Sequence, residues 1–317
     1  MKSASLFNLA KVVFLGLFFA SCSKDRLLFD ESQNIKNKVF LDTYGINVLA
    51  KNLPTAVKFS VKSDKDFPLT TKKGTKLWLE SYRLWVSKWN NPTYPYDIEI
   101  IELYSLKDML LYEKPTTSYG QMLTTGGAFY LNVTKDGKTL SPNLANFPKI
   151  TVPASKVDNA MTVFYEVGER QDGAISQGGA TWQVASSDTS SERYPVLVAG
   201  KELYQIFPRQ FGWINCDKFY NYEGAKTFVK FESEIPAINK IMLFMVFPDI
   251  SSVIQIFGGQ SLEVPVGERV KIVAIAETED ESLYSFIKEY TVEKDHVIKL
   301  ELTQTSAKDL LKALDKL

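Results

Sequence analysis

Few residues in this sequence are of types that can perform acid–base or metal chemistry. The chain of 317 residues has one histidine, His296, and two cysteines, Cys22 and Cys216. Zinc sites are built from several His or Cys ligands, and a serine triad needs a histidine together with a nucleophile turn such as Gly-x-Ser-x-Gly, which is absent. His296 stands where a strand is expected to begin, which predicts an edge or turn residue. We therefore expect no metal site and no cofactor.

Carboxylates are the remaining catalytic candidates. Asp97 and Glu99 are two positions apart in an expected strand, so both project from one face. Two acids placed across a bond suffice for a glycosidase, and the pair therefore keeps a carboxylate-dependent hydrolase as a distant alternative. The same spacing is ordinary for a solvated strand face. The acidic loop 276–282 lacks the residue order of a preformed calcium loop, which favours a solvated turn.

Aromatic side chains concentrate in one short segment that is expected to lie between strands. Rings and amides crowd together there, at Tyr82, Trp85, Trp89, Asn90, Asn91, Tyr94 and Tyr96. Flat apolar rings pack on sugar rings or partner proteins, while asparagine amides hydrogen-bond hydroxyl groups. The candidate ligand-binding residues are Trp89, Asn90, Asn91, Tyr94 and Tyr96. The alternative, that these rings pack in the core or cover a sheet edge, stays open.

The first two dozen residues predict a bacterial lipoprotein signal. A basic start at Lys2 and Lys11 precedes the apolar run from Val12 to Ala20. That run, about nine residues long, is too short to span a bilayer and suits a cleaved signal peptide. The following "FASC" is similar to a lipobox, in which the cysteine is acylated, so Cys22 is the expected lipidation site. We expect an outer-membrane anchor, with the cell surface or the periplasmic face undecided.

Charge and cysteine content argue against a nucleic-acid-binding protein and against a fold held by disulfides. Lys and Arg number 37, as do Asp and Glu, so no net field attracts nucleic acid, and no nucleic-acid partner is expected. Once Cys22 carries lipid, Cys216 has no partner for an intramolecular disulfide. Cys216 lies between apolar neighbours, which predicts a buried, unreactive thiol. With 45% hydrophobic residues, the chain can build a large core.

The alternation of apolar and polar residues predicts an all-β fold, with two β-sandwich (Ig-like) domains and a short C-terminal α-helix. The expected organisation is a signal peptide at 1–21, a lipidated tether at 22–38, an N-terminal sandwich at 39–222 and a smaller C-terminal sandwich at 223–317. The expected strands are 56–62, 76–86, 97–104, 128–134, 149–152, 161–167, 181–185, 203–207, 212–215, 227–232, 240–247, 253–257, 270–276, 283–291 and 297–302.

Local signals mark helices and turns. The segments 105–111 and 305–317 have helical spacing, and Ser306 and Asp309 are spaced as in a capping box. The leucine stripe of the closing helix is expected to dock on a sheet, with a partner-binding helix as the alternative. Asp136-Gly137 predicts a two-residue hairpin turn. Gly126 and Gly127 predict a bend or bulge.

Several phrases between residues 55 and 302 resemble a functionally obscure type of Bacteroidota surface lipoprotein. They are "KKGTKLWL", "YDIEIIELYSLKDMLL", "KPTTSYGQMLTTGGAFYLNVTKDGKTL", "ITVP", "MTVFYEV", "TWQVA", "GWINCDKF" and "VPVGERVKIVAIAE". The resemblance implies a β-sandwich binding or assembly module of the cell surface, without a catalytic residue set. Where that group has a short turn, this chain has the longer "ESYRLWVSKWNNPTYPY", which contains the aromatic cluster.

These observations favour a lipid-anchored binding or adhesion protein of the cell envelope that is not an enzyme. The expected partners are the membrane, through the N-terminal lipid, and a protein or glycan. A glycan-binding accessory lipoprotein of a polysaccharide-uptake system is the alternative.

Overall fold

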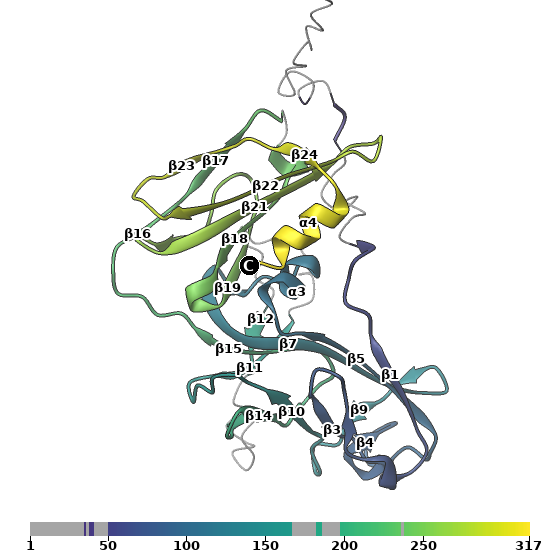
Figure 1. The fold of residues 1–317 in the computed structure, drawn as a ribbon. Coiled ribbons are helices and arrows are strands. Elements are labelled where there is room, and N and C mark those ends of the chain that lie inside the picture. Colours follow the sequence, from purple (N-terminus) through teal and green to yellow (C-terminus); the bar gives the residue numbers. More distant parts are fainter. Residues whose placement is uncertain (1–34, 36–37, 41–49, 167–181, 186–196, 236–237) are drawn as a thin grey trace, which may run out of the picture.

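The computed structural model describes residues 35, 38–40, 50–166, 182–185, 197–235 and 238–317 (Figure 1). Over these residues the fold is all-β, as the alternation predicted, with two β-sandwiches and two short α-helices. The signal peptide, Cys22 and most of the expected tether lie outside the described residues. Residue 167, the end of the expected strand 161–167, and residue 181, the start of the expected strand 181–185, also lie outside the described residues. Within the described residues no helix has the length and apolar character to span a bilayer.

The N-terminal sandwich consists of two main sheets. The larger sheet is formed by β1 (Val57–Val61), β5 (Tyr96–Leu103), β6 (Thr117–Ser118), β7 (Gln121–Lys135), β8 (Lys138–Thr139), β11 (Thr162–Glu166), β12 (Trp182–Val184) and β15 (Gly212–Phe219). Its order is β1-β5-β7-β15-β11-β12, with β6 and β8 paired to β7. The smaller sheet contains β2 (Leu69–Thr70), β3 (Lys76–Trp78), β10 (Lys149–Pro153), β13 (Leu197–Ala199) and β14 (Leu203–Ile206), in the order β13-β14-β10-β3-β2.

Alternate residues of these strands form the core between the two sheets. On β5, Tyr96, Ile98 and Ile100 are buried, whereas Asp97 is exposed and Glu99 half-buried on the other face. Such alternation follows from the two-residue period of a strand. Glu99 lies 3.6 Å from the Lys58 ammonium on β1. The two carboxylates therefore share a largely solvated face, as their spacing predicted.

The expected strand 76–86 is wrong, because the structure divides it into two strands of different sheets. After β3 the chain forms a 3-10 turn at Ser81–Arg83 and then β4 (Leu84–Trp85). β4 pairs with β9 (Ser141–Pro142) in a separate two-stranded sheet. The turn is stabilised where the Arg83 Nε donates to the Glu80 carboxylate at 2.6 Å. The apolar positions 77 and 79 are followed by Ser81 and Arg83 and then by the buried Leu84, so the alternation changes phase at the break.

Glycine and aspartate fix two irregularities of β7. Asp136 and Gly137 have φ of 50° and 74° and close the β7–β8 hairpin, which confirms the predicted turn. A register shift between Asn215 and Asp217 on β15 lies opposite Gly126 and Gly127, which confirms the predicted bulge.

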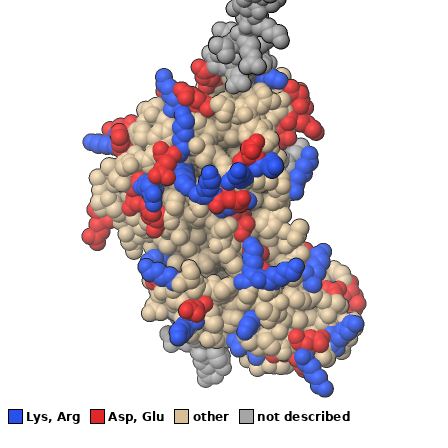
Figure 2. Space-filling model, in the orientation of Figure 1, with Lys and Arg blue, Asp and Glu red and all other residues tan. Residues whose placement is uncertain are grey.

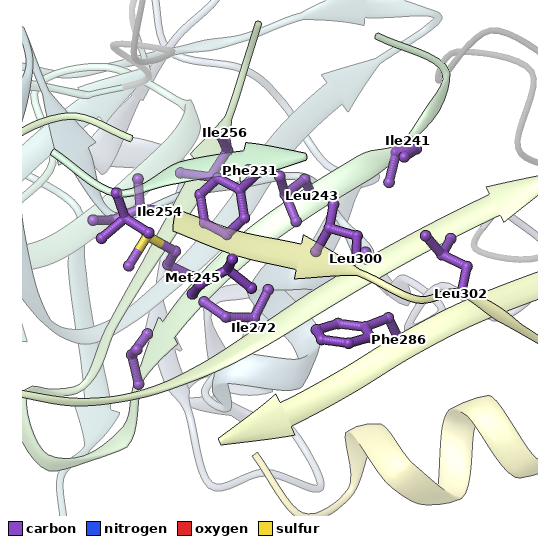
Figure 3. Packing of buried hydrophobic residues seen from close by; sticks show 14 of the residues in the cluster. Phe231, Ile241, Leu243, Met245, Ile254, Ile256, Ile272, Phe286, Leu300 and Leu302 are labelled. Atoms are coloured by element: carbon purple, nitrogen blue, oxygen red, sulfur yellow. The ribbon is translucent and has the colours of Figure 1, made fainter. Parts of the chain in front are cut away.

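The C-terminal sandwich encloses the second large core (Figure 3). Its five-stranded sheet has the order β19-β18-β21-β22-β24. The strands are β18 (Met242–Phe247), β19 (Ser252–Ile256), β21 (Arg269–Glu277), β22 (Leu283–Thr291) and β24 (Thr303–Thr305). The core lies between this sheet and the parallel pair β17 (Lys230–Ser233) and β23 (Val297–Leu300). A third pair joins β16 (Lys226–Thr227) to β20 (Val264–Pro265).

Two residues of the N-terminal segment belong to the C-terminal core. Ile35 and Phe40 are buried there, and Phe40 forms a β-bridge with Thr278. The expected tether to residue 38 and an N-terminal sandwich from residue 39 therefore need correction, because these apolar side chains gain more by burial in that core than on a solvated tether. Between the sandwiches, β15 ends at Phe219 and β16 begins at Lys226, and the predicted boundary at 223 lies in that interval.

Both expected helices are present and lie at the junction of the two sandwiches. They are α3 (Leu106–Leu111) and α4 (Ala307–Leu314). Leu110 and Leu111 of α3 share one buried cluster with Leu310 and Leu314 of α4 and with the outer face of the C-terminal sheet. The Ser306 hydroxyl accepts a hydrogen bond from the Asp309 N–H at 3.1 Å, which confirms the predicted cap. The leucine stripe is therefore docked on a sheet.

Candidate functional site

The aromatic segment forms a tight hairpin at one end of the N-terminal sandwich. The Val86 N–H donates to the Asn90 carbonyl at 2.8 Å, and the Asn90 N–H donates to the Ser87 carbonyl at 2.9 Å. These bonds leave Lys88 and Trp89 as the central residues of the turn. We call residues 85–91 the Trp89 hairpin.

Trp89 is the most exposed large apolar residue that the structure describes, with 73% of its surface accessible. Its φ of 68° is in the left-handed region, which is a genuine outlier for a bulky residue. The Trp85 ring centroid is 5.5 Å away and the Lys88 ammonium lies 5.7 Å from the Trp89 ring. A strained backbone that holds an apolar ring in solvent is a feature typical of binding surfaces.

The surface around the hairpin includes further exposed apolar residues. Tyr82 and Val86 flank β4, and Leu144 follows β9. The Asn143 side-chain amide donates to the Tyr82 carbonyl at 2.6 Å and joins the two segments. The sequence cluster included Tyr82, but Leu144 stands more than fifty positions from Trp89, and only the β4–β9 pairing brings these segments to one end of the sandwich.

The predicted binding residues separate into exposed and structural groups. Asn90 is exposed at the hairpin with Trp89. The exposed Asn91 uses its side-chain amide within the fold, because it donates to the Leu84 carbonyl at 2.8 Å and to the Ser81 carbonyl at 3.1 Å. The half-buried Tyr94 accepts from the Ser81 N–H at 3.1 Å and donates to the Asp64 carboxylate.

The assignment of Tyr96 to a ligand surface is wrong. Tyr96 begins β5 and points into the core, where 1% of its surface is accessible. Its hydroxyl donates to the Leu79 carbonyl at 2.6 Å, and burial raises the pKa of that hydroxyl far above its ordinary value. Tyr94 stacks on it with ring centroids 5.1 Å apart. For these two tyrosines the structure supports the alternative of core packing.

A second candidate site, which the sequence did not reveal, is a groove of about 880 Å³ where the two sandwiches meet. Loops and strand ends of the N-terminal sandwich form most of it, and the turn at Asp249–Ser251 contributes from the C-terminal sandwich. Ligand sites are common at such junctions. No sequence motif signalled the groove, because its lining comes from segments that are far apart in the chain.

Glycines and tyrosines line part of this groove. Gly126 and Gly127 lie at the bulge of β7, and a Cβ atom on Gly127 would approach the Tyr104 ring to 2.7 Å. A Cβ on Gly126 would lie 3.4 Å from the Tyr204 ring. Because these glycines have no side chains, the Tyr104 and Tyr204 rings can pack against β7. The main chain of the glycines is also open to close approach by a ligand.

Ion pairs hold charged side chains in the groove. The Lys73 ammonium donates to the Asp108 carboxylate at 3.0 Å and to the Glu102 carbonyl at 2.9 Å. Lys218 donates to Asp158 at 2.6 Å, which lowers the pKa of that carboxyl. Three lysines and three aspartates line the groove within the described residues, so its formal charge is balanced. Across the visible face of the molecule, acidic and basic side chains are also interspersed (Figure 2).

A buried carboxylate explains how the Lys73 turn is positioned. Glu102 is buried, and its Oε1 accepts from the Thr71 hydroxyl at 2.8 Å and also from the Thr75 hydroxyl. The Tyr104 hydroxyl lies 2.6 Å from the Thr75 hydroxyl. The turn between β2 and β3 is therefore fixed at both ends.

Asp217 is a second buried carboxyl, close to the bulge. Its Oδ2 accepts from the Asn215 amide at 2.6 Å, and its Oδ1 has no hydrogen-bond partner among the described residues. Burial raises its pKa well above the ordinary range. Asp217 is therefore a structural residue whose buried carboxyl favours the protonated form.

The other sequence candidates occupy structural positions. Cys216 is buried, and burial raises the pKa of its thiol well above the usual value, as expected for an unreactive cysteine. His296 precedes β23 with its ring 5.7 Å from that of Tyr290. Asp280 of the acidic loop is bound by Lys38 at 2.7 Å. Over the described residues, no group of three or more His, Cys, Asp or Glu side chains is placed to hold a metal ion.

Searches with protein-family models and against curated proteins found no match to this chain.

The geometry of the described residues offers two surfaces for non-covalent binding, the Trp89 hairpin and the groove.

Proposed function

We propose that this chain is a lipid-anchored binding protein of the bacterial outer membrane, without catalytic activity, whose Trp89 hairpin contacts a partner. Acylation of Cys22 supplies the anchor, on the basis of the lipobox-like "FASC". The resemblance to Bacteroidota surface lipoproteins supports the same assignment. Cys22→Ser should release the protein from membranes, and protease treatment of intact cells distinguishes the cell surface from the periplasmic face.

The observation that carries the binding role is the exposed Trp89 ring on a hydrogen-bonded turn. A tryptophan side chain has roughly 200 Å² of surface, of which about 150 Å² is accessible here, and a partner that covers half of it removes about 75 Å² from water. At ~25 cal/mol per Å² this contributes about 2 kcal/mol, or roughly a 30-fold change in Kd.

The test is cross-linking of the intact anchored protein in cells, followed by recovery of its partners. Trp89→Ala should reduce recovery of the specific partner, while the wild type retains it. Tyr119→Ala is the matched control, because Tyr119 is also an exposed aromatic residue, 60% accessible, with a positive φ of 47°. Equal recovery from all three proteins would remove the hairpin from the proposed function.

The groove favours a second candidate, a glycan-binding accessory protein of a polysaccharide-uptake system. Each sugar hydroxyl both donates and accepts hydrogen bonds, and the Lys73–Asp108 and Lys218–Asp158 pairs offer donors beside acceptors. The balanced charge suits a neutral ligand, and Tyr104 is an aromatic residue of the lining that suits contact with a sugar ring. A screen of soluble neutral glycans tests this: binding that Lys218→Ala weakens and Trp89→Ala leaves unchanged supports the groove.

A carboxylate-dependent hydrolase is the distant alternative. Asp97→Ala and Glu99→Ala variants, assayed for glycan hydrolysis beside the wild type, test it directly.

A further inference from the structure

We infer that the C-terminal sandwich is the membrane-proximal unit and that the Trp89 hairpin faces away from the anchoring bilayer. The hairpin then meets a macromolecule outside that bilayer, rather than its lipids or a protein embedded in it. This inference rests on the proposed acylation of Cys22. It goes further because it assigns an orientation to the molecule and a location to the partner.

The chain that leads from the anchor is attached to the C-terminal sandwich. Ile35 and Phe40 are buried in its core. The Glu279 N–H donates to the Val39 carbonyl at 3.0 Å, and the Lys240 ammonium donates to the Phe40 carbonyl at 2.7 Å. The buried side chains of Ile35 and Phe40, together with these hydrogen bonds to the Val39 and Phe40 carbonyls, fix the point at which the tether leaves the sandwich.

An ion pair reinforces this attachment at the acidic loop. The Lys38 ammonium lies 2.7 Å from the Asp280 carboxylate, which lowers the pKa of that carboxyl and raises that of Lys38. Asp280 is exposed and Lys38 is partly exposed, so solvent screens the pair and it contributes less than the buried side chains of Ile35 and Phe40. The acidic loop, for which the sequence favoured a solvated turn over a calcium site, thus binds a cation of the same chain.

The remaining tether is short. Twelve residues lie between Cys22 and Ile35, so thirteen residue-to-residue steps join them. Even when fully extended, they span at most about 45 Å at ~3.3–3.6 Å per residue. The face of the C-terminal sandwich that carries Ile35 therefore stays within that distance of the bilayer.

Main-chain bonds join the two sandwiches. The Thr116 N–H donates to the Val253 carbonyl at 2.7 Å, and the Val253 N–H donates to the Thr116 hydroxyl at 2.8 Å. The Thr125 N–H donates to the Ser251 carbonyl at 2.9 Å. Together with the leucine cluster of α3 and α4, these bonds oppose bending at the junction.

The hairpin and the tether attachment lie at opposite ends of this joined unit. Figure 1 shows β24 and the edge of the C-terminal sheet at one end, and β4 and β9 at the other. Phe40 bridges to Thr278, on the loop between β21 and β22, close to the β22–β24 pairing at Leu283. Trp89 follows β4 at the opposite end. With the junction fixed, the hairpin cannot fold back to the anchored end.

Energy transfer from the protein to labelled lipid tests this orientation. The full-length lipidated protein is placed in vesicles of phosphatidylethanolamine and phosphatidylglycerol that carry an acceptor dye on the outer headgroups. The donor dye is attached to one introduced cysteine, at Lys88→Cys beside Trp89 or at Glu279→Cys beside the attachment. Cys216 is buried and lipid occupies Cys22, so only the introduced thiol reacts.

We expect strong transfer from position 279 and a loss of transfer at position 88. Equal transfer at both positions, as in a molecule lying flat, or stronger transfer at position 88 would overturn the inference. Flotation of the vesicles separates this failure from failure of the proposed function. Wild-type protein that does not float with the vesicles overturns the anchor and, with it, the orientation, whereas protein that floats but shows equal transfer overturns the orientation alone.

Discussion

Alanine replacements at Tyr96 and Trp89 separate core packing from surface exposure within one aromatic segment. Tyr96 is buried and its hydroxyl donates to the Leu79 carbonyl, so Tyr96→Ala should lower the free energy of unfolding by roughly 3–5 kcal/mol, as truncation of a buried aromatic does. About a quarter of the Trp89 surface is covered, or roughly 50 Å², so Trp89→Ala should cost only about 1 kcal/mol at ~25 cal/mol per Å².

The assay is chemical denaturation in urea, followed by far-ultraviolet circular dichroism, with the slope m compared between variants. Tyr96→Phe is the control that removes only the hydrogen-bonding hydroxyl, and it should cost about 1 kcal/mol. A loss at Trp89→Ala as large as that at Tyr96→Ala would show that the Trp89 ring covers a core. A near-zero loss at Tyr96→Ala would refute its placement in β5.

Three further predictions test the buried carboxyl, the closing helix and the anchor. Because the pKa of Asp217 is raised, the folded state holds a proton that the unfolded state releases above about pH 4. The free energy of unfolding therefore falls as pH rises beyond that point. Asp217→Asn should reduce this fall, as measured by denaturation series at several pH values. An unchanged pH dependence in Asp217→Asn would contradict the assignment. Truncation after Thr303 removes the buried Leu310 and Leu314, each worth about 1.5–3 kcal/mol, and should lower Tm; an unchanged melting curve would refute docking. Cys22→Ser should move the protein from the membrane to the soluble fraction, and a variant still bound like the wild type would exclude acylation.

The sequence predicted most of the strands because their alternation was set by burial on one face. On β5, for example, the apolar residues at 96, 98 and 100 enter the core and the acids at 97 and 99 do not. The closing helix could be predicted equally well from the sequence, because its cap and leucine stripe are local features. The strands that were missed, such as β9 and β24, have two or three residues and carry no period of their own.

Long-range pairing accounts for what the sequence did not reveal at the candidate sites. The break between β3 and β4 arises because the two strands pair with different partners, and that choice leaves no local signal. Tyr96 looked like part of an exposed loop, although its spacing from Ile98 and Ile100 matched the buried face of β5. The groove and the attachment of Phe40 depend on segments separated by more than a hundred residues, so no spacing motif could indicate them.

The most direct test of the central claim, that the Trp89 hairpin is the contact surface, is site-specific photo-cross-linking on intact cells. A photoreactive amino acid replaces Trp89 in one strain and the exposed Tyr119 in another. We predict a discrete cross-linked species from position 89 and none from position 119. Cross-linking at position 119 but not at 89, or equal products at both positions, would contradict the proposal.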